Sequence, residues 1–82
     1  MGESRKTHKL KTLPEYFNKV LGGEKNFELR KDDRGFEPGD AILLQEYENG
    51  NYTGRDCTRE ILYILRNAPQ YGLKKSYCIL SF

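Results

Sequence analysis

The chain of 82 residues carries 14 Lys and Arg against 12 Asp and Glu, a formal net charge of +2, with 37% apolar residues and no Trp. This length indicates one small domain, and so small a net charge does not by itself indicate a polyanionic partner. No apolar run approaches the about 18 residues of a membrane span, and the first ten residues lack the apolar centre of a secretory signal. We therefore expect a cytoplasmic protein with no membrane partner.

The N-terminal part predicts a strand followed by a helix. Residues 1–7 are polar and predict a flexible tail, so that a single domain spans residues 8–82. A short strand is expected at "HKLKTL", and Pro14 suits the first turn of a helix. Helical spacing then predicts one buried face, and Gly22 with Gly23 ends the helix. The expected face consists of Leu13, Tyr16, Phe17, Val20 and Leu21.

The rest of the chain predicts strands separated by turns. Strand patterns occur in "EKNFELRK", "AILLQEY", the long "RDCTREILYILR", which could be straight or bent, and "KKSYCILSF". The Asn-Gly pair of "ENGNYTG" is typical of a hairpin. The resulting order is β-α-β-β-β-β. Because about five strands in so small a chain would leave exposed edges, we expect an α+β, mainly β fold: a small, partly closed β-barrel with one helix after the first strand.

The second strand alternates charged and apolar residues. Strand geometry puts Phe27 and Leu29 on one face, which we expect to pack on the core, and Asn26, Glu28 and Arg30 on the other. Two interpretations of the charged face stay open. Glu28 and Arg30 could form an exposed ion pair of little energetic value, or they could hold one ligand between them.

Basic residues surround this strand in the sequence. If the first two strands are neighbours, seven cationic or titratable side chains gather around Glu28 and create a local positive field. This arrangement predicts an anion or phosphate site. The set is His8, Lys9, Lys11, Lys25, Arg30, Lys31 and Arg34. Tyr71, in the loop "NAPQYG", could add a face on which a base stacks or could serve packing alone.

The remaining candidates indicate structure more than chemistry. Cys57 and Cys78 form no CxxC pair and the chain has a single His, so we expect reduced thiols and neither a metal nor a cofactor. Asp40, in the tight turn "FEPGD", is expected to hold its own backbone. Glu46 ends a strand, and no pattern distinguishes it from the other carboxylates.

Nearly the whole chain resembles a small bacterial and phage family known as domain of unknown function 3850. The similarity covers "LKTLPEYFNKVLGGEKNFELRKDDRGFEPGDAILLQEY", then "YTG" and "YGL". It implies an ASCH-like domain of the PUA-like superfamily, with a cleft for RNA or a nucleotide at the motif G-x-K-x-x-E-x-R. By position this motif falls on Gly23, Lys25, Glu28 and Arg30.

Three functions follow as expectations. The leading one is a non-catalytic, monomeric RNA- or nucleotide-binding module that uses the basic cleft. The alternative is a small amidohydrolase acting on an acetylated cytidine, as some ASCH proteins resembling this chain are, with Lys25 and Glu28 as acid and base. In that resemblance Glu28 stands where the enzyme has its nucleophile, and a loop carrying a second acid is missing. A protein-interaction domain is the third.

Overall fold

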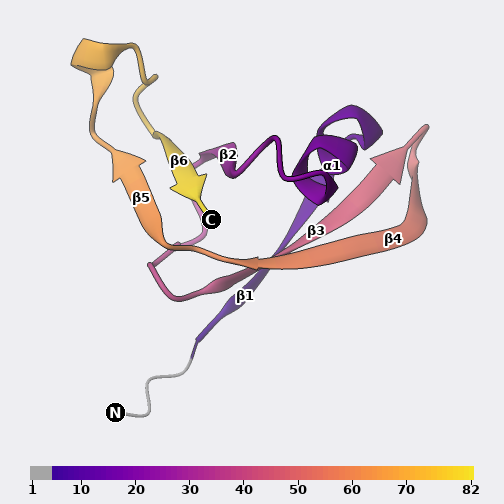
Figure 1. The fold of residues 1–82 in the computed structure, drawn as a ribbon. Coiled ribbons are helices and arrows are strands. Elements are labelled where there is room, and N and C mark those ends of the chain that lie inside the picture. Colours follow the sequence, from indigo (N-terminus) through magenta and orange to yellow (C-terminus); the bar gives the residue numbers. More distant parts are fainter. Residues whose placement is uncertain (1–4) are drawn as a thin grey trace.

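The computed structural model describes residues 5–82, which form six strands, one α-helix and one short 3₁₀ helix (Figure 1). The predicted α+β class, mainly β with one helix after the first strand, is confirmed. Four residues of the predicted tail, 1–4, lie outside the described residues, and the first strand begins at Thr7. In chain order the elements are β1 (Thr7–Thr12), α1 (Pro14–Leu21), β2 (Phe27–Lys31), β3 (Ala41–Glu48), β4 (Asn51–Glu60), β5 (Tyr63–Arg66), the 3₁₀ helix (Pro69–Tyr71) and β6 (Tyr77–Ser81).

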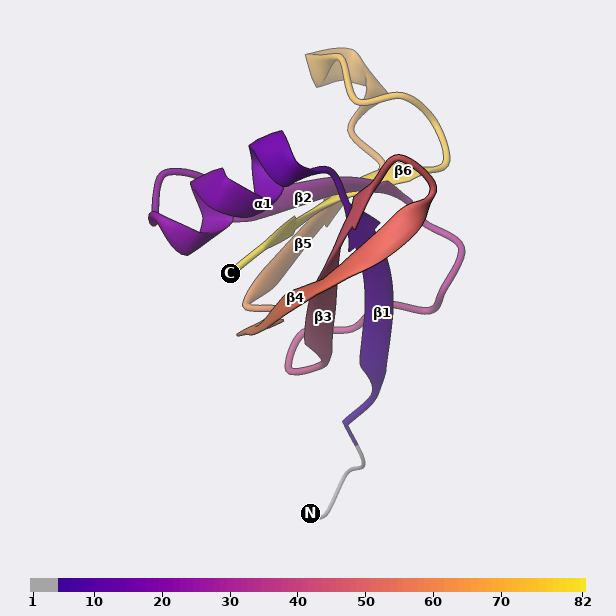
Figure 2. The same cartoon turned by 90° about the vertical axis from the view of Figure 1, so that its right-hand side faces the viewer.

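The strands form two three-stranded sheets, in the orders β1-β3-β4 and β2-β6-β5 (Figures 1 and 2). β1 runs parallel to β3, and α1 and β2 lie in the crossover that such a pairing requires. All other pairs are antiparallel. The predicted Asn-Gly hairpin is confirmed between β3 and β4, where Asn49 and Gly50 both adopt positive φ angles, 52° and 82°. The described strands thus form two small sheets and no closed barrel.

The prediction of one strand over residues 55–66, straight or bent, is wrong, because the chain changes from one sheet to the other near the middle of this segment. β4 ends at Glu60 and β5 begins at Tyr63. Between them the buried Ile61 donates its N–H to Asp40 O and accepts from Gly39 N, at 2.9 and 2.8 Å. The apolar run "ILYIL" continues through this point, so the sequence pattern gave no sign of the break.

A single apolar core fills the space between the two sheets. It contains side chains of β1 and β3 on one side, β5 and β6 on the other, and α1 at one end: Leu10, Phe17, Val20, Phe36, Ile42, Leu44, Ile61, Ile64, Cys78 and Leu80. The helix contributes only Phe17 and Val20. The predicted burial of Leu13, Tyr16 and Leu21 is wrong, since an eight-residue helix that contacts β3 covers a narrower stripe.

The predicted orientation of β2 is also wrong. Phe27 and Leu29 are 46% and 56% exposed, whereas Glu28 is 4% exposed and lies opposite Leu80 of β6. Alternation defines two faces of a strand but does not say which one turns inward. Here the charged face turns inward, because both oxygens of Glu28 find cationic partners that offset the cost of burying a carboxylate.

Candidate functional site

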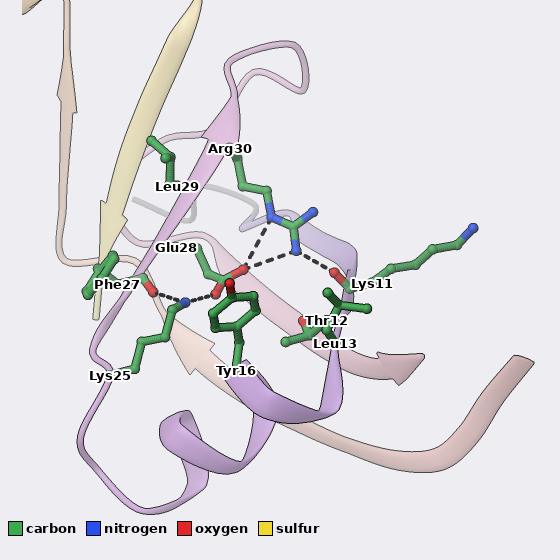
Figure 3. A pocket seen from close by; sticks show the side chains of 9 residues that line it. All are labelled: Lys11, Thr12, Leu13, Tyr16, Lys25, Phe27, Glu28, Leu29 and Arg30. Atoms are coloured by element: carbon green, nitrogen blue, oxygen red, sulfur yellow. Dashed lines mark hydrogen bonds and ion pairs between the residues drawn. The ribbon is translucent and has the colours of Figure 1, made fainter. Parts of the chain in front are cut away.

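A cavity of about 420 Å³ opens between β2 and the junction of β1 with α1 (Figure 3). We call it the β2 pocket. Its volume lies within the range of about 300–1,000 Å³ that is typical of small-molecule sites. The residues that line it are Lys11, Thr12, Leu13, Tyr16, Lys25, Phe27, Glu28, Leu29 and Arg30.

Glu28 stands at the base of the pocket between two cations. Its Oε1 accepts a hydrogen bond from Lys25 Nζ, and its Oε2 accepts from Arg30 Nη2 at 3.0 Å and Nε at 3.3 Å. The side chains of Lys25 and Arg30 are 16% and 27% exposed, so both cations still reach the solvent-facing side of the cavity. This three-residue cluster, the Glu28 cluster, is the only charged group in the pocket besides Lys11.

The backbone around the pocket fixes each member of this cluster. α1 ends at Leu21 and is followed by Gly22, and Gly23 adopts a φ of 80°, which turns the chain back toward β2. Lys25 then donates to Phe27 O at 2.7 Å, and its ammonium lies 4.8 Å from the centre of the Phe27 ring. These contacts hold the Lys25 ammonium in place beside Glu28 without closing the cavity.

β1 and β2 are neighbours through side chains and not through a shared ladder. Arg30 Nη2 donates to Lys11 O at 2.5 Å, and Arg34 Nη1 donates to Lys9 O at 2.7 Å. The two strands belong to different sheets. The expectation that basic residues of both strands meet near Glu28 therefore holds in part, with arginine side chains spanning the gap.

Of the predicted ligand-binding residues, the β2 pocket brings together Lys11, Lys25, Glu28 and Arg30. Lys31 and Arg34 line a separate hollow of about 140 Å³, which shares Arg30 with the pocket. Tyr71 lies on the 3₁₀ helix, 83% exposed, and does not line the pocket.

Five pocket residues lie outside the predicted ligand-binding set: Thr12, Leu13, Tyr16, Phe27 and Leu29. Leu13 and Tyr16 fit the apolar stripe of the helix and were assigned to the core, but both are exposed at the pocket (Figure 3). The Tyr16 ring lies 5.6 Å from the Lys25 ammonium. One feature of the sequence could have indicated the exposure of Leu13 and Tyr16: the apolar face of the helix holds more large residues than a helix of two turns can bury.

His8 does not contribute to the basic field, because it is buried and bound to Asp40. Its Nε2 lies 2.8 Å from Asp40 Oδ2, and its ring stacks edge-on against Phe36 at 4.7 Å. Asp40 also accepts from the backbone N–H groups of Lys6 and Glu37, at 3.3 and 3.1 Å. Burial acts to raise the pKa of Asp40, but these hydrogen bonds outweigh it and the pKa is lowered. Asp40 thus binds the backbone of its own turn at Glu37, as expected, and also binds Lys6 and His8 of the first strand region, which the sequence did not indicate.

Glu46 is a second buried acid that sequence reasoning did not distinguish. Arg55 donates to both of its oxygens, at 2.9 and 2.8 Å, and Thr53 donates its hydroxyl at 2.6 Å. The hydrogen bonds from Arg55, and then that from Thr53, lower the pKa of Glu46 to about 2. Because Arg55 also lies 4.9 Å over the Phe17 ring, this network ties β3 and β4 to the helix. Its role is structural.

The described residues offer little other chemistry. Residues 5–82 contain no cluster of three or more His, Cys, Asp or Glu that could hold a metal ion. Cys57 and Cys78 are free thiols, and burial raises the pKa of both. Within the same residues no helix is long and apolar enough to cross a membrane.

Comparison with known proteins gives a family for this geometry. The family model described as "Domain of unknown function (DUF3850)" matches residues 7–82. A relative from Escherichia phage P2, described as "Uncharacterized 12.9 kDa protein in GpA 3'region", is 46% identical over 56 residues, which are 68% of this chain. The match spans about half, 51%, of that phage protein. The chain therefore belongs to the DUF3850 family.

Proposed function

We propose that this domain binds RNA or a nucleotide in the β2 pocket without catalysing a reaction. The observation that carries the proposal is a buried carboxylate with two cations beside it in an open cavity, next to an exposed tyrosine ring. The charged residues of the pocket are three cations and one acid, Lys11, Lys25, Arg30 and Glu28, so the cavity carries a net positive charge that favours an anionic ligand.

Each part of a nucleotide has a suitable partner in this cavity. A phosphate would accept from Arg30, whose guanidinium lies beside Glu28, whereas the Lys11 side chain extends away from these two groups and its ammonium lies 4.5 Å from the Tyr47 ring (Figure 3). A base would stack on the exposed face of Tyr16. Glu28, which accepts from both cations, would either orient them or accept from an amino group of the base.

The resemblance to ASCH-like domains supports the same proposal. We propose that the domain belongs to the PUA-like superfamily, and two sheets around one core with the helix at one end are compatible with the partly open barrel of that superfamily. In that superfamily a cleft at the G-x-K-x-x-E-x-R motif is the expected RNA or nucleotide site. We further propose that the protein is a cytoplasmic monomer and that it binds RNA at this cleft.

Titration of ¹⁵N-labelled protein with RNA oligonucleotides and with single nucleotides, followed by NMR at two salt concentrations, tests the site. We expect shifts at the amides of Lys25 to Arg30 and a loss of affinity of about 0.7 log units per log of salt for each phosphate contact. Arg30→Ala should weaken binding about tenfold or more, the worth of one charge-assisted hydrogen bond. Lys9→Ala, a change of an exposed lysine on β1 outside the pocket, is the control. Equal affinities of the two variants would contradict the proposal.

The alternative function, hydrolysis of an acetylated nucleoside, is favoured by one observation. Lys25 and Glu28 are in direct contact at an open cavity, so a proton can pass between them and a substrate. Incubation with acetylated cytidine followed by chromatography measures turnover. Lys25→Arg separates the two functions, because arginine keeps the positive charge but does not give up its proton. Hydrolysis should then disappear while nucleotide binding persists. Turnover that survives this change would exclude the Lys25 mechanism.

A further inference from the structure

The outward face of the β2-β6-β5 sheet is apolar and uncovered. In antiparallel pairs the residues directly opposite each other share a face, so the register places Phe27, Ser81 and Tyr63 in one row, Leu29, Ile79 and Leu65 in the next, and Lys31 and Tyr77 in the third. We call these eight residues the outer sheet face. Phe27, Leu29 and Tyr63 are 46%, 56% and 62% exposed.

This face lies on the other side of β2 from the Glu28 cluster. Figure 3 shows Phe27 and Leu29 on one side of the strand and Glu28 and Arg30 on the opposite side. The helix contacts β3 of the other sheet, and each of the outward residues named above is at least partly exposed. The outer sheet face is therefore not a wall of the core, and it adjoins the β2 pocket at Phe27 and Leu29.

Its chemistry combines aromatic rings with positive charge. Phe27, Tyr63 and Tyr77 belong to the face, and none of its eight residues is acidic. Lys25 lies 4.8 Å from the Phe27 ring at one end, and Lys74 lies 5.5 Å from the Tyr77 ring at the other. Rings that offer a stacking surface, with lysines at both ends and no carboxylate between them, complement a chain of bases linked by phosphates.

The dimensions of the face suit a short stretch of single-stranded nucleic acid. The face extends about 13 Å along the strands, from residue 27 to residue 31, and about 10 Å across three strands, from the strand rise and spacing. The four-stranded sheet of one common RNA-binding domain stacks two or three bases on its aromatic residues. The lysines beside the rings favour an anionic strand over a second copy of the protein, since a second copy that used the same face would bring the same positive charges to it.

We infer that the outer sheet face binds single-stranded nucleic acid by stacking bases on Phe27, Tyr63 and Tyr77, while Lys31 and Lys74 meet the phosphates. Lys25 stands between this face and the β2 pocket, because it contacts both Phe27 and Glu28. One strand can therefore continue from the face into the pocket. The inference shares the nucleic-acid chemistry of the proposed function, and Phe27 and Lys25 belong to both sites. Tyr63 and Tyr77 lie outside the pocket, so changes at Tyr63 and at Arg30 let the two proposals fail separately.

Fluorescence anisotropy with labelled, short homopolymeric RNA tests the inference. Tyr63→Ala should weaken oligonucleotide binding at least about fivefold, the lower end of what one stacked base contributes, and Tyr63→Phe should retain it. Single nucleotides, which report on the pocket, should bind Tyr63→Ala as they bind the unaltered protein. Tyr52→Ala is the matched control, since Tyr52 is similarly exposed on β4 of the other sheet.

Three results would overturn the inference. If Arg30→Ala lowers the affinity for the oligonucleotide and Tyr63→Ala does not, the oligonucleotide binds in the pocket and not on the outer sheet face. Absence of oligonucleotide binding by the unaltered protein would remove the face as well. Sedimentation velocity that shows a dimer converted to monomers by Tyr63→Ala, without an effect on RNA, would assign the face to self-association.

Discussion

Replacement of Glu28 by glutamine tests whether the pocket is held together by charge. The change keeps the size of the side chain but removes the charge that faces Lys25 and Arg30. Breaking a buried ion pair by removing one partner costs about 3–5 kcal/mol. Here the two cations are 16% and 27% exposed, so water reaches them and the cost should lie at or just below the lower end of that range, about 2–3 kcal/mol. In a domain of this size that loss corresponds to a fall in Tm of roughly 10–20 °C.

Thermal and urea denaturation followed by far-UV circular dichroism measure this loss. The control is Glu24→Gln, because Glu24 forms an exposed pair with Lys19 at 3.4 Å, which should contribute less than about 1 kcal/mol. A double-mutant cycle with Arg30→Gln then isolates the Glu28–Arg30 interaction. If Glu28→Gln has the same melting temperature as Glu24→Gln, water or another group stabilises the two cations in place of the carboxylate. The Glu28 cluster would then not hold the pocket together.

Two further predictions concern the other buried acids. The pKa of Glu46 is lowered from 4.5 to about 2, so this carboxylate stabilises the fold above about pH 4.5, and that contribution should be lost as the pH falls toward about 2. The pKa of Asp40 is lowered as well, so its contribution should also be lost as the pH falls below the ordinary value for an aspartate. Melting temperatures measured across this range should fall less steeply in Glu46→Gln, and an unchanged slope would contradict the assignment. Asp40→Ala leaves His8 and two backbone donors without an acceptor and should cost about 2 kcal/mol or more in urea denaturation, whereas Asp33→Ala, an exposed change in the same loop, should cost little.

The sequence predicted the ends of the helix and the hairpin turn well, because neighbouring residues alone determine the backbone conformation there. Pro14 begins the helix, Gly22 follows its end, and the Asn49-Gly50 pair closes the hairpin, because each residue restricts or permits a particular backbone conformation. The parallel pairing of β1 with β3 and the change of sheet at Ile61 were not predictable in this way. Both depend on contacts between segments far apart in the chain, which no local pattern records.

The pocket was predicted in composition but not in orientation. Lys25, Glu28 and Arg30 do meet, yet they meet on the inward face of β2 and not on the outward one. Alternation of apolar and polar residues predicts that the apolar face of a strand packs on the core. This prediction fails when the polar face has hydrogen-bond or ion-pair partners that offset the cost of burying it. The partners of Glu28 come from a loop and from its own strand, so burial of the carboxylate could be inferred only from their geometry.

The inward orientation of the charged face of β2 explains why this one short strand contributes to both the β2 pocket and the outer sheet face. If Phe27 and Leu29 faced the core, Glu28 and Arg30 would lie in open solvent. There water and salt would screen the ion pair strongly, and it would bind a charged ligand only weakly. With the charges turned inward, the Glu28 cluster lies in a partly enclosed cavity, where its interactions with a phosphate are stronger. The apolar residues are then left outside, where they would be a liability in a monomer unless something covers them. Exposed rings beside lysines make a nucleic-acid strand a suitable cover, and the same ligand that enters the pocket can supply it.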